Sequence, residues 1–350
     1  MTADHLPTLA LSASPAVNGR EQTVLDWGQA LLAQIPAELE PEWRDLAWLW
    51  LSPDLLARPL SRAYAWPAAQ VSSAVQQFLT QQQARCKHEV EAQSEQDRSQ
   101  LREFITAAGM RRLGLYAERL LQFDFARQQM LLAHGLQVQR GKQTLGEFDF
   151  VLKADAETCW HLELACKFYL CVPRPDTALS LFDYLGPNLA DSLGAKLKKI
   201  QQAQLQLADY PEAQQLLKAS AGSDLAGAFA HIKGCLFYRP ADLSLSVPDQ
   251  ISPQHARGLI LELDELLDLP VRTVVTLARL EWLAPRTWQE PQVQSLEMAA
   301  QALQAHWQIQ ANPQMLAIVQ NSGTSWHEVL RVFVIPPGWW QRAQSLVRSG

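Results

Sequence analysis

The segment TCWHLELACKFYLCV, residues 158–172, places acidic and basic side chains within an otherwise apolar run. Side chains alternate between the two faces of an extended strand, so Glu163 and Lys167 share one face. The opposite face is apolar throughout and consists of Trp160, Leu162, Leu164, Cys166, Phe168 and Leu170. A carboxylate and an ammonium group are costly to bury alone in a central strand. We therefore expect them to face a partner, a metal ion or a cleft.

The preceding segment GEFDFVL supplies a second pair of carboxylates, because Glu147 and Asp149 fall on one face of a strand. An adjacent antiparallel strand would set Asp149 beside Glu163. Two like charges at that separation raise one pKa unless a cation lies between them. A hard divalent cation with oxygen ligands, Mg²⁺ or Mn²⁺, is the simplest solution.

A third carboxylate precedes these strands on a predicted helix. Glu118 follows Leu115 by three residues and precedes Leu121 by three and Phe125 by seven. It therefore lies on the apolar stripe that faces the sheet, and we expect it to point towards the same place.

Each of these residues also has a structural interpretation. Glu163 and Lys167 could form an ion pair along the strand, Glu147 could be a solvated edge residue, and His161 could be a satisfied, partly buried histidine rather than part of a site. In GPNLADSLGAKL, Asn188 and Asp191 have the spacing of a helix cap and an acid in the first turn, which favours capping over catalysis. The lysines of the following helix form either a solvated face or a basic patch that meets phosphates; they are Lys196, Lys198 and Lys199.

The elements around these residues alternate. Helical patterns occupy residues 23–110 and one long helix is predicted from 111 to Gly135, where the glycine would end it. Strands at 136–140, 146–154 and 158–172, a helix at 189–207 and a strand at 231–240 follow. This order predicts an α/β fold. Further strand patterns lie at 258–266, 274–283 and 329–336.

Composition narrows the classes of function. The net charge of −6 argues against a broadly basic surface but allows a local basic groove. Five irregularly spaced cysteines indicate reduced thiols, and residues 1–20 lack a signal peptide's charged start, so the cytoplasm is expected. The sequence contains no run of about 18 apolar residues, so no membrane span is predicted. Most of the 12 tryptophans are expected in the core.

Several other site types do not fit the sequence. Cys166 points to the opposite strand face from His161, so the cysteines and histidine of this segment do not converge as a zinc site. The chain has no phosphate-binding P-loop, no glycine pattern for a dinucleotide and no Gly-x-Ser-x-Gly elbow, so no nucleotide cofactor is expected.

A helix glutamate, then GEFDF, then a strand with an acid followed by lysine resembles the PD-(D/E)XK nuclease superfamily, and most of all its Holliday-junction-resolvase-like members. The segments RDLAWLWLSPDLL, LGLYAERLLQFDF, GEFDFVL, HLELACKFYL and YLGPNLADSLGAKL together resemble more closely a bacterial family known as a domain of unknown function, DUF1853. That family is usually grouped with the same superfamily.

The resemblance implies roles for four residues. Asp149 would be the motif aspartate, Glu163 the acid of the (D/E)XK pair, and Glu118 the helix acid that completes a Mg²⁺ or Mn²⁺ site. The superfamily lysine belongs two residues after the acid, where this chain has Ala165. Lys167 lies about 7 Å further along the same face, and its flexible stem would bring the ammonium back to orient a water molecule.

The resemblance also implies an organisation. We expect a flexible tail at 1–22, a helical region at 23–109, a PD-(D/E)XK (restriction-endonuclease-like) core with a mixed sheet flanked by helices at 110–240, and an α+β extension packed on it at 241–350. The implied activity is metal-dependent hydrolysis of phosphodiester bonds in DNA or RNA, by an endonuclease or an exonuclease. The alternative is an inactive protein of the same fold that binds nucleic acid or protein as a scaffold, with partners bound by the Trp-rich terminal regions.

Overall fold

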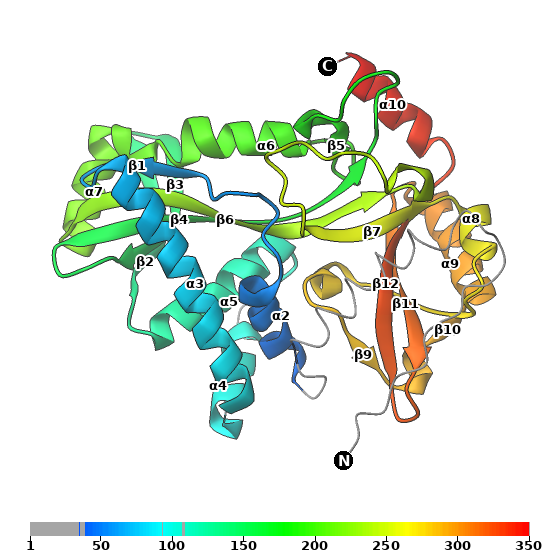
Figure 1. The fold of residues 1–350 in the computed structure, drawn as a ribbon. Coiled ribbons are helices and arrows are strands. Elements are labelled where there is room, and N and C mark those ends of the chain that lie inside the picture. Colours follow the sequence, from blue (N-terminus) through cyan, green and yellow to red (C-terminus); the bar gives the residue numbers. More distant parts are fainter. Residues whose placement is uncertain (1–34, 36–38, 93, 107–108, 350) are drawn as a thin grey trace.

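The computed structural model describes residues 35, 39–92, 94–106 and 109–349 (Figure 1). The predicted tail, the start of the predicted helical region and Trp27 lie outside the described residues. The helices are α2 (Pro41–Leu51), α3 (Ala68–Ala92), α4 (Glu95–Thr106), α5 (Leu113–Arg127), α6 (Leu193–Lys199), α7 (Pro211–Ala221), α8 (Leu263–Leu267), α9 (Leu296–Ile309) and α10 (Trp339–Ser349). The strands are β1 (Ser61–Ala63), β2 (Leu131–Arg140), β3 (Gln143–Lys153), β4 (Thr158–Cys171), β5 (Tyr184–Leu185), β6 (Asp224–Tyr238), β7 (Ala256–Leu261), β8 (Thr273–Thr276), β9 (Thr287–Trp288), β10 (Gln294–Ser295), β11 (Gln314–Asn321) and β12 (Trp326–Val334).

One sheet runs through the described chain in the order β10-β8-β11-β12-β7-β6-β4-β3-β2, with β1, β5 and β9 paired to its sides. The neighbours β4–β6, β6–β7 and β7–β12 are parallel, whereas β2–β3, β3–β4, β11–β12 and β8–β11 are antiparallel. The prediction of an α/β protein with a mixed sheet flanked by helices is confirmed. The strands after residue 240 join this same sheet, because β7 pairs with β6.

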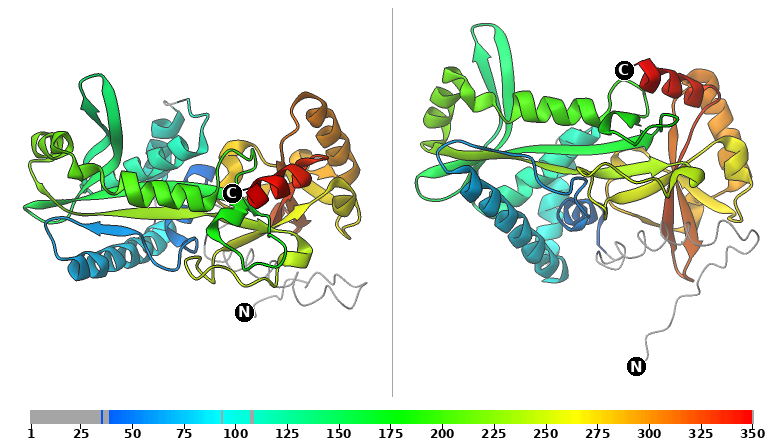
Figure 2. Two further views of the ribbon diagram at one scale, coloured as in Figure 1. Left: turned by 90° about the horizontal axis from the view of Figure 1, so that it is seen from above. Right: turned by 45° about the horizontal axis from the view of Figure 1, so that its top comes forward.

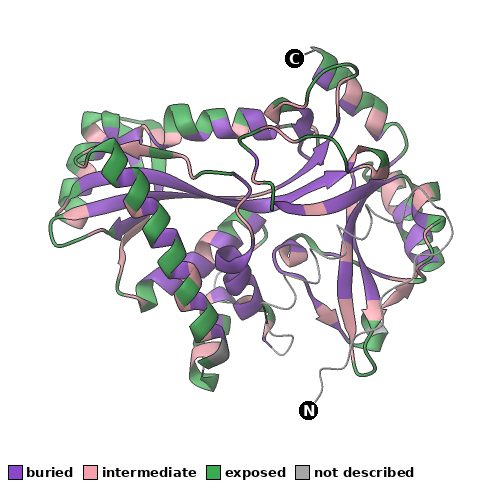
Figure 3. Ribbon diagram, in the orientation of Figure 1, coloured by how far each residue is buried: buried purple, intermediate pink, exposed green. Residues whose placement is uncertain are grey.

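Helices cover both faces of the long strands β4 and β6. Helices α2, α3 and α5 lie on one face, and α6 and α7 lie on the other (Figures 1 and 2). The strands between them are largely buried (Figure 3). The two faces of β4 divide between two apolar clusters, so that Leu162 and Phe168 pack towards the first group of helices and Ala165 and Tyr169 towards α6. Most of the described tryptophans are core residues, as predicted; the buried ones are Trp43, Trp48, Trp50, Trp160, Trp282, Trp288 and Trp339.

The predicted helix from 111 to Gly135 is wrong in its second half. Helix α5 ends at Arg127, and Gly135 lies within β2. The end is a Schellman motif: the Met130 N–H donates to Phe125 O and the Gln129 N–H to Ala126 O, each at 3.0 Å. Gln129 takes the left-handed conformation, with φ of 57°, that this motif usually gives to glycine. A glutamine gives no sequence signal for such an end.

The other predicted boundaries also change. Helix α6 begins at Leu193, where Ser192 Oγ accepts from the Ala195 N–H at 3.2 Å, so Asn188 and Asp191 do not cap it as predicted. Strand β6 begins seven residues before the predicted 231. The predicted strands at 258–266 and 274–283 each turn into a helical segment after a few residues; the first turns because Glu262 and Glu265 form a capping box that starts α8.

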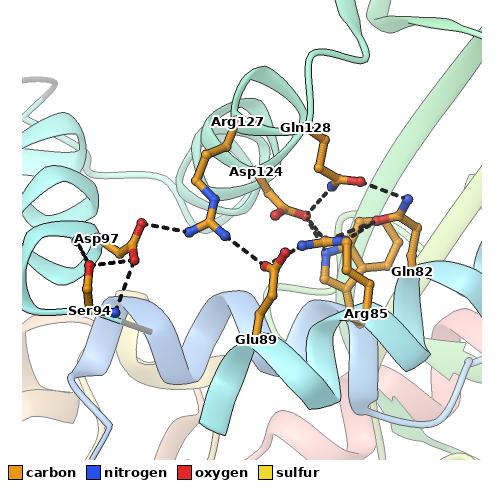
Figure 4. Close-up of polar contacts among 9 residues, drawn as sticks. Gln82, Arg85, Glu89, Ser94, Asp97, Asp124, Arg127 and Gln128 are labelled. Atoms are coloured by element: carbon orange, nitrogen blue, oxygen red, sulfur yellow. Dashed lines mark hydrogen bonds and ion pairs between the residues drawn. The ribbon is translucent and has the colours of Figure 1, made fainter. Parts of the chain in front are cut away.

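A polar network fixes α5 against α3 and α4 (Figure 4). Asp124 of α5, almost fully buried, accepts hydrogen bonds from Trp50 Nε1 at 2.9 Å and from the Arg85 guanidinium at 2.6 Å. Arg127 joins Glu89 of α3 to Asp97 of α4. Because these partners satisfy a buried carboxylate, α5 is held in one position relative to the sheet.

A second buried network joins α2 and α5 to the segment after β8. Asp45 is fully buried and accepts from Tyr116 Oη at 2.7 Å, from Arg286 at 2.7 Å and from the Ala284 N–H at 3.0 Å. Arg331 of β12 donates to the carbonyl groups of residues 282–284 and pairs with Glu328. These contacts place the 279–286 segment beside the start of α5. No helix in the described part of the chain is long and apolar enough to cross a membrane.

Candidate metal and phosphate site

The acidic residues Asp149 and Glu163 meet where β3 and β4 separate. The antiparallel pairing puts Phe150 opposite Leu162, so the next step in the same register puts Asp149 opposite Glu163. The ladder stops there. The Leu164 N–H donates instead to Asp149 Oδ2 at 2.9 Å. The predicted antiparallel placement of these two carboxylates is confirmed.

Glu163 is almost entirely buried, and one of its oxygens lacks a partner. Its Oε1 accepts from Gln204 Nε2 and lies 3.7 Å from Lys196 Nζ. Its Oε2 accepts no hydrogen bond from the described residues, and His161 Nε2 lies 3.9 Å from it. A buried carboxylate oxygen without a donor is costly, so this atom is suited to an added cation or proton.

Lys196 and Gln204 reach Glu163 because of a π-helical turn. Residues Ile200–Gln204 continue α6 with five-residue hydrogen bonding, and the Leu205 N–H donates to Ile200 O at 2.9 Å. In a regular α-helix, residues eight apart differ by about 80° around the axis. One inserted residue removes about 100° of that rotation, so Gln204 lies about 20° from Lys196. Lys196 Nζ then donates to Gln204 Oε1 at 3.0 Å.

The charges in this cluster perturb one another. Burial raises the pKa of Glu118 to about 7, and the charges of Asp149 and Glu147 act in the same direction. Burial raises the pKa of Asp149 to about 6, although the Leu164 N–H opposes this shift, and the Glu163 side chain acts as its hydrogen-bond partner. Burial and Asp149 raise the pKa of Glu163. Without a cation, therefore, protonation of the paired carboxyl groups is favoured.

Lys167 does not join this cluster through an ion pair. Its Nζ lies 3.1 Å from Asp191 Oδ2, and Tyr169 Oη donates to the same oxygen at 3.1 Å. Within the described chain, the alternative of an ion pair between Lys167 and Glu163 is not found at 4.0 Å or less. Instead, Lys196 supplies the ammonium nearest to the acids, and burial lowers its pKa while Glu163 opposes that shift.

Two neighbouring residues have other environments. His161 is fully buried rather than partly buried, its Nε2 lacks a hydrogen-bond partner among the described residues, and burial lowers its pKa to about 3. It is therefore neutral at physiological pH and packs edge-on against Phe148 at 4.8 Å between ring centroids. Glu147 is exposed and accepts from Gln137 at 3.1 Å, as expected for an edge residue.

A cavity of about 1090 Å³ lies along the open edge of β4. Glu118 and Lys196 line one part of it, and residues 276–279 and 312–314 line another wall. Asp149 and Glu163 do not line this cavity, so the buried acids adjoin it through Glu118 and Lys196. The cavity is open enough for a ligand larger than one small molecule, since ligand pockets usually measure about 300–1,000 Å³.

The comparison with protein families now places the chain. A family described as a domain of unknown function, DUF1853, matches residues 44–335. The chain belongs to this family. No curated protein and no solved structure matches it. The DUF1853 region runs from α2 to the end of β12 and thus contains both buried networks and every acid of the cluster.

The DUF1853 cluster has the chemistry of a cation site but not a preformed cage. Among the described residues, no three His, Cys, Asp or Glu side chains are placed together to hold a metal ion. Asp149 and Glu163 lie together, whereas Glu118 faces them from α5 and interacts through its charge. Holding an ion requires Glu118 to turn towards the pair, or requires oxygen ligands from water or a substrate phosphate.

Lys196 and Gln204 contact Glu163, and the sequence did not single them out for this cluster. The basic spacing of Lys196, Lys198 and Lys199 indicated either a solvated face or a phosphate contact. The structure separates them, because Lys198 and Lys199 are exposed while Lys196 points to Glu163. The only signal in the sequence was that Lys196 precedes Leu197 and Ile200, which are buried.

Proposed function

We propose that this protein hydrolyses phosphodiester bonds in DNA or RNA, using Mg²⁺ or Mn²⁺ on a PD-(D/E)XK-like core. Asp149 and Glu163 would hold the ion, with Glu118 as the third carboxylate. Such an ion polarises a phosphate oxygen and lowers the pKa of a bound water molecule. The observation that carries this proposal is the unpartnered, buried Oε2 of Glu163 beside two further carboxyl groups with raised pKa values.

The protein side chains would have separate roles. Lys196, rather than Lys167, is the cation close enough to Glu163 to steady negative charge that develops on a phosphate. Gln204 orients both groups, because it donates to Glu163 and accepts from Lys196. Glu118, with a pKa of about 7, exchanges a proton near neutral pH and suits general acid–base work as well as ion binding.

The first test measures cation binding and cleavage in parallel. The thermal midpoint is followed while Mg²⁺ or Mn²⁺ is titrated into wild type, Asp149→Ala and Glu163→Gln, and each protein is then incubated with labelled single-stranded and duplex oligonucleotides. In wild type alone, we expect the thermal midpoint to rise with metal concentration, because a ligand that binds the native state stabilises that state. We also expect metal-dependent cleavage in wild type alone.

The matched control is Glu147→Gln. This exposed carboxylate lies two residues before Asp149 on the same face of β3, but it contacts Gln137 rather than Glu163. Glu147→Gln should keep the metal-dependent rise in thermal midpoint and at least about a third of the wild-type cleavage rate. Cleavage at the wild-type rate by both Asp149→Ala and Glu163→Gln would refute the site assignment.

A second candidate is a protein of the same fold that binds nucleic acid without cutting it. Two observations favour it: Lys167 is occupied by Asp191, and no three described metal-binding groups are placed as a cage. This candidate predicts no effect of Mg²⁺ or Mn²⁺ on the thermal midpoint. It also predicts oligonucleotide binding that is the same in EDTA and in excess Mg²⁺.

A further inference from the structure

The cavity beside the carboxylates has more positive than negative side chains, although the chain as a whole carries a net charge of −6. Its cations come from elements far apart in the sequence: Arg111, Arg112, Lys167, Lys196 and Arg279. Its acidic lining residues are Glu118 and Asp191. A local excess of positive charge in an acidic protein indicates an anionic ligand at that place.

Three of these cations have no carboxylate partner. Lys167 and Lys196 are paired with Asp191 and Glu163. Arg111, Arg112 and Arg279, in contrast, form no ion pair within 4.0 Å in the part of the chain that the structure describes. All three are exposed. They are therefore available to an external anion, although the carboxylates of Glu118 and Asp191 belong to the same lining.

Arg279 is held in place by stacking rather than by charge. Its guanidinium carbon lies 3.9 Å from the ring centroid of Trp282. Trp282 is nearly buried and packs edge-on against Phe168 at 5.5 Å and Phe333 at 5.2 Å between centroids. A stacked guanidinium keeps its N–H edges available, and these match two oxygens of a phosphate.

Arg111 and Arg112 line another wall of the cavity, where α5 begins. Arg112 is the N-cap residue, no side chain caps the helix, and its first turn has no acidic residue. Leu113 and Gly114 line the same cavity, so the uncapped end of the helix faces it. The partial positive charge of a helix N-terminus adds to that of the two arginines.

We propose that Arg111–Arg112 and Arg279 bind phosphates of one nucleic-acid strand, which crosses the cavity past Glu118 and Lys196. This inference rests on the proposed function, which supplies the bond that reacts. It adds the residues that contact the strand on either side of that bond. A strand, unlike a mononucleotide, offers several phosphates to these separate cations at once, which favours a polymer as the ligand. The segment that carries Arg279 is fixed to α2 and α5 through Asp45 and Arg286, so the two walls keep a constant relation.

The test measures binding without cleavage. Fluorescence anisotropy of a labelled single-stranded 12-mer is recorded in EDTA at several salt concentrations for wild type, Arg279→Ala, the double variant Arg111→Ala/Arg112→Ala, and Arg272→Ala. Arg272 is an exposed arginine of the same part of the chain but does not line the cavity, so it is the matched control.

We expect each cavity variant to weaken binding about tenfold at low salt. Each lost phosphate contact should also reduce the slope of log K against log salt by about 0.7. Arg272→Ala should leave affinity and slope within about twofold of wild type. Unlabelled mononucleotide should fail to compete at concentrations at which unlabelled 12-mer competes.

The outcomes separate this inference from the proposed hydrolysis. Tight binding that depends on both walls, without cleavage in Mg²⁺ or Mn²⁺, supports the strand-binding cavity and counts against hydrolysis. Metal-dependent cleavage with wild-type affinity in both cavity variants would overturn the strand-binding assignment while leaving the hydrolysis intact. Competition by a mononucleotide as strong as that by the 12-mer would also overturn it.

Discussion

At the scale of single residues, the carboxyl cluster makes stability depend on pH. Burial raises the pKa of Glu118 from its ordinary value of 4.5 to about 7 in the folded protein. Between these values the folded state binds more protons than the unfolded state, so the free energy of unfolding falls as pH rises. The same sign holds for Asp149, whose pKa rises from 3.8 to about 6.

We predict that Glu118→Gln removes part of this dependence. Between pH 5 and pH 8 in EDTA, the free energy of unfolding of wild type should fall by about 1–2 kcal/mol more than that of Glu118→Gln. This figure allows for the partial exposure of Glu118. Urea unfolding at pH 5, 6, 7 and 8 measures the difference. Glu103→Gln, at an exposed position of α4, is the control and should follow wild type. Parallel curves for wild type and Glu118→Gln would contradict the raised pKa.

The sequence predicted part of this residue-scale arrangement. The alternation of β4 placed Glu163 on the face opposite Leu162 and Leu164, and the hairpin-like order of β3 and β4 brought Asp149 beside it. Both depend only on the two-residue period and local pairing. Lys167 was predicted to reach the acids because its stem is long, but Asp191 arrives from a loop whose path no periodic pattern describes.

At the scale of elements, α5 carries Glu118 and is followed by a residue in an unusual conformation. Gln129 has φ of 57° in the Schellman motif and an exposed side chain. A non-glycine residue is strained there, because its Cβ crowds the backbone in the left-handed region. The helix therefore ends at this point for reasons of tertiary structure, with β2 starting at once.

We predict that Gln129→Gly stabilises the protein by about 0.5–1 kcal/mol, since glycine adopts this conformation without strain. The control is Gln122→Gly, in the interior of the same helix, which should destabilise by about 1 kcal/mol. Differential scanning calorimetry shows both changes as opposite shifts of the thermal midpoint. A lower midpoint for Gln129→Gly would show that the glutamine side chain has stabilising contacts that outweigh the strain.

Element boundaries were the least predictable part of the fold. The helical periodicity of residues 111–125 continues into 126–134 without a glycine or proline to stop it, so the pattern alone extended the helix to Gly135. Similarly, one extra residue in the π-helical turn of α6 decides that Gln204 faces Glu163, and no composition signal marks that insertion.

At the scale of the whole molecule, the two walls of the cavity depend on one buried carboxylate. Asp45 is fully buried and satisfies Arg286, Tyr116 and the Ala284 N–H together. Removing its charge leaves Arg286 nearly buried without an ion-pair partner. Removing one partner of a buried ion pair destabilises a protein more than replacing both partners with apolar residues.

We predict that Asp45→Asn lowers the free energy of unfolding by about 3–5 kcal/mol. Adding Arg286→Met should recover part of this loss, because the uncompensated charge is then absent and the two changes are not additive. Urea denaturation of wild type, both single variants and the double variant gives the coupling directly. Equal effects that simply add would show that Arg286 and Asp45 act independently.

The α/β class and the mixed sheet followed from the order of strands and helices, but the extent of the sheet did not. Residues after 240 contained recognisable strands such as VLRVFVIP. Their neighbours in space, β7 beside β6 and β12 beside β7, are set by packing between distant segments. Local patterns specify which residues are extended, whereas the order of strands depends on contacts that only the folded chain makes.

The reach of the Arg44 contact has a consequence for how the chain assembles during synthesis. Its guanidinium donates to the carbonyl of Pro285, 241 positions away. The β3–β4 hairpin, in contrast, joins Asp149 and Glu163, which are only 14 positions apart along the chain. The carboxylates of the hairpin therefore leave the ribosome well before the segment of Arg279. Their local pairing precedes the closure of such a long loop. The protein reaches its two-walled form only when most of its length has left the ribosome.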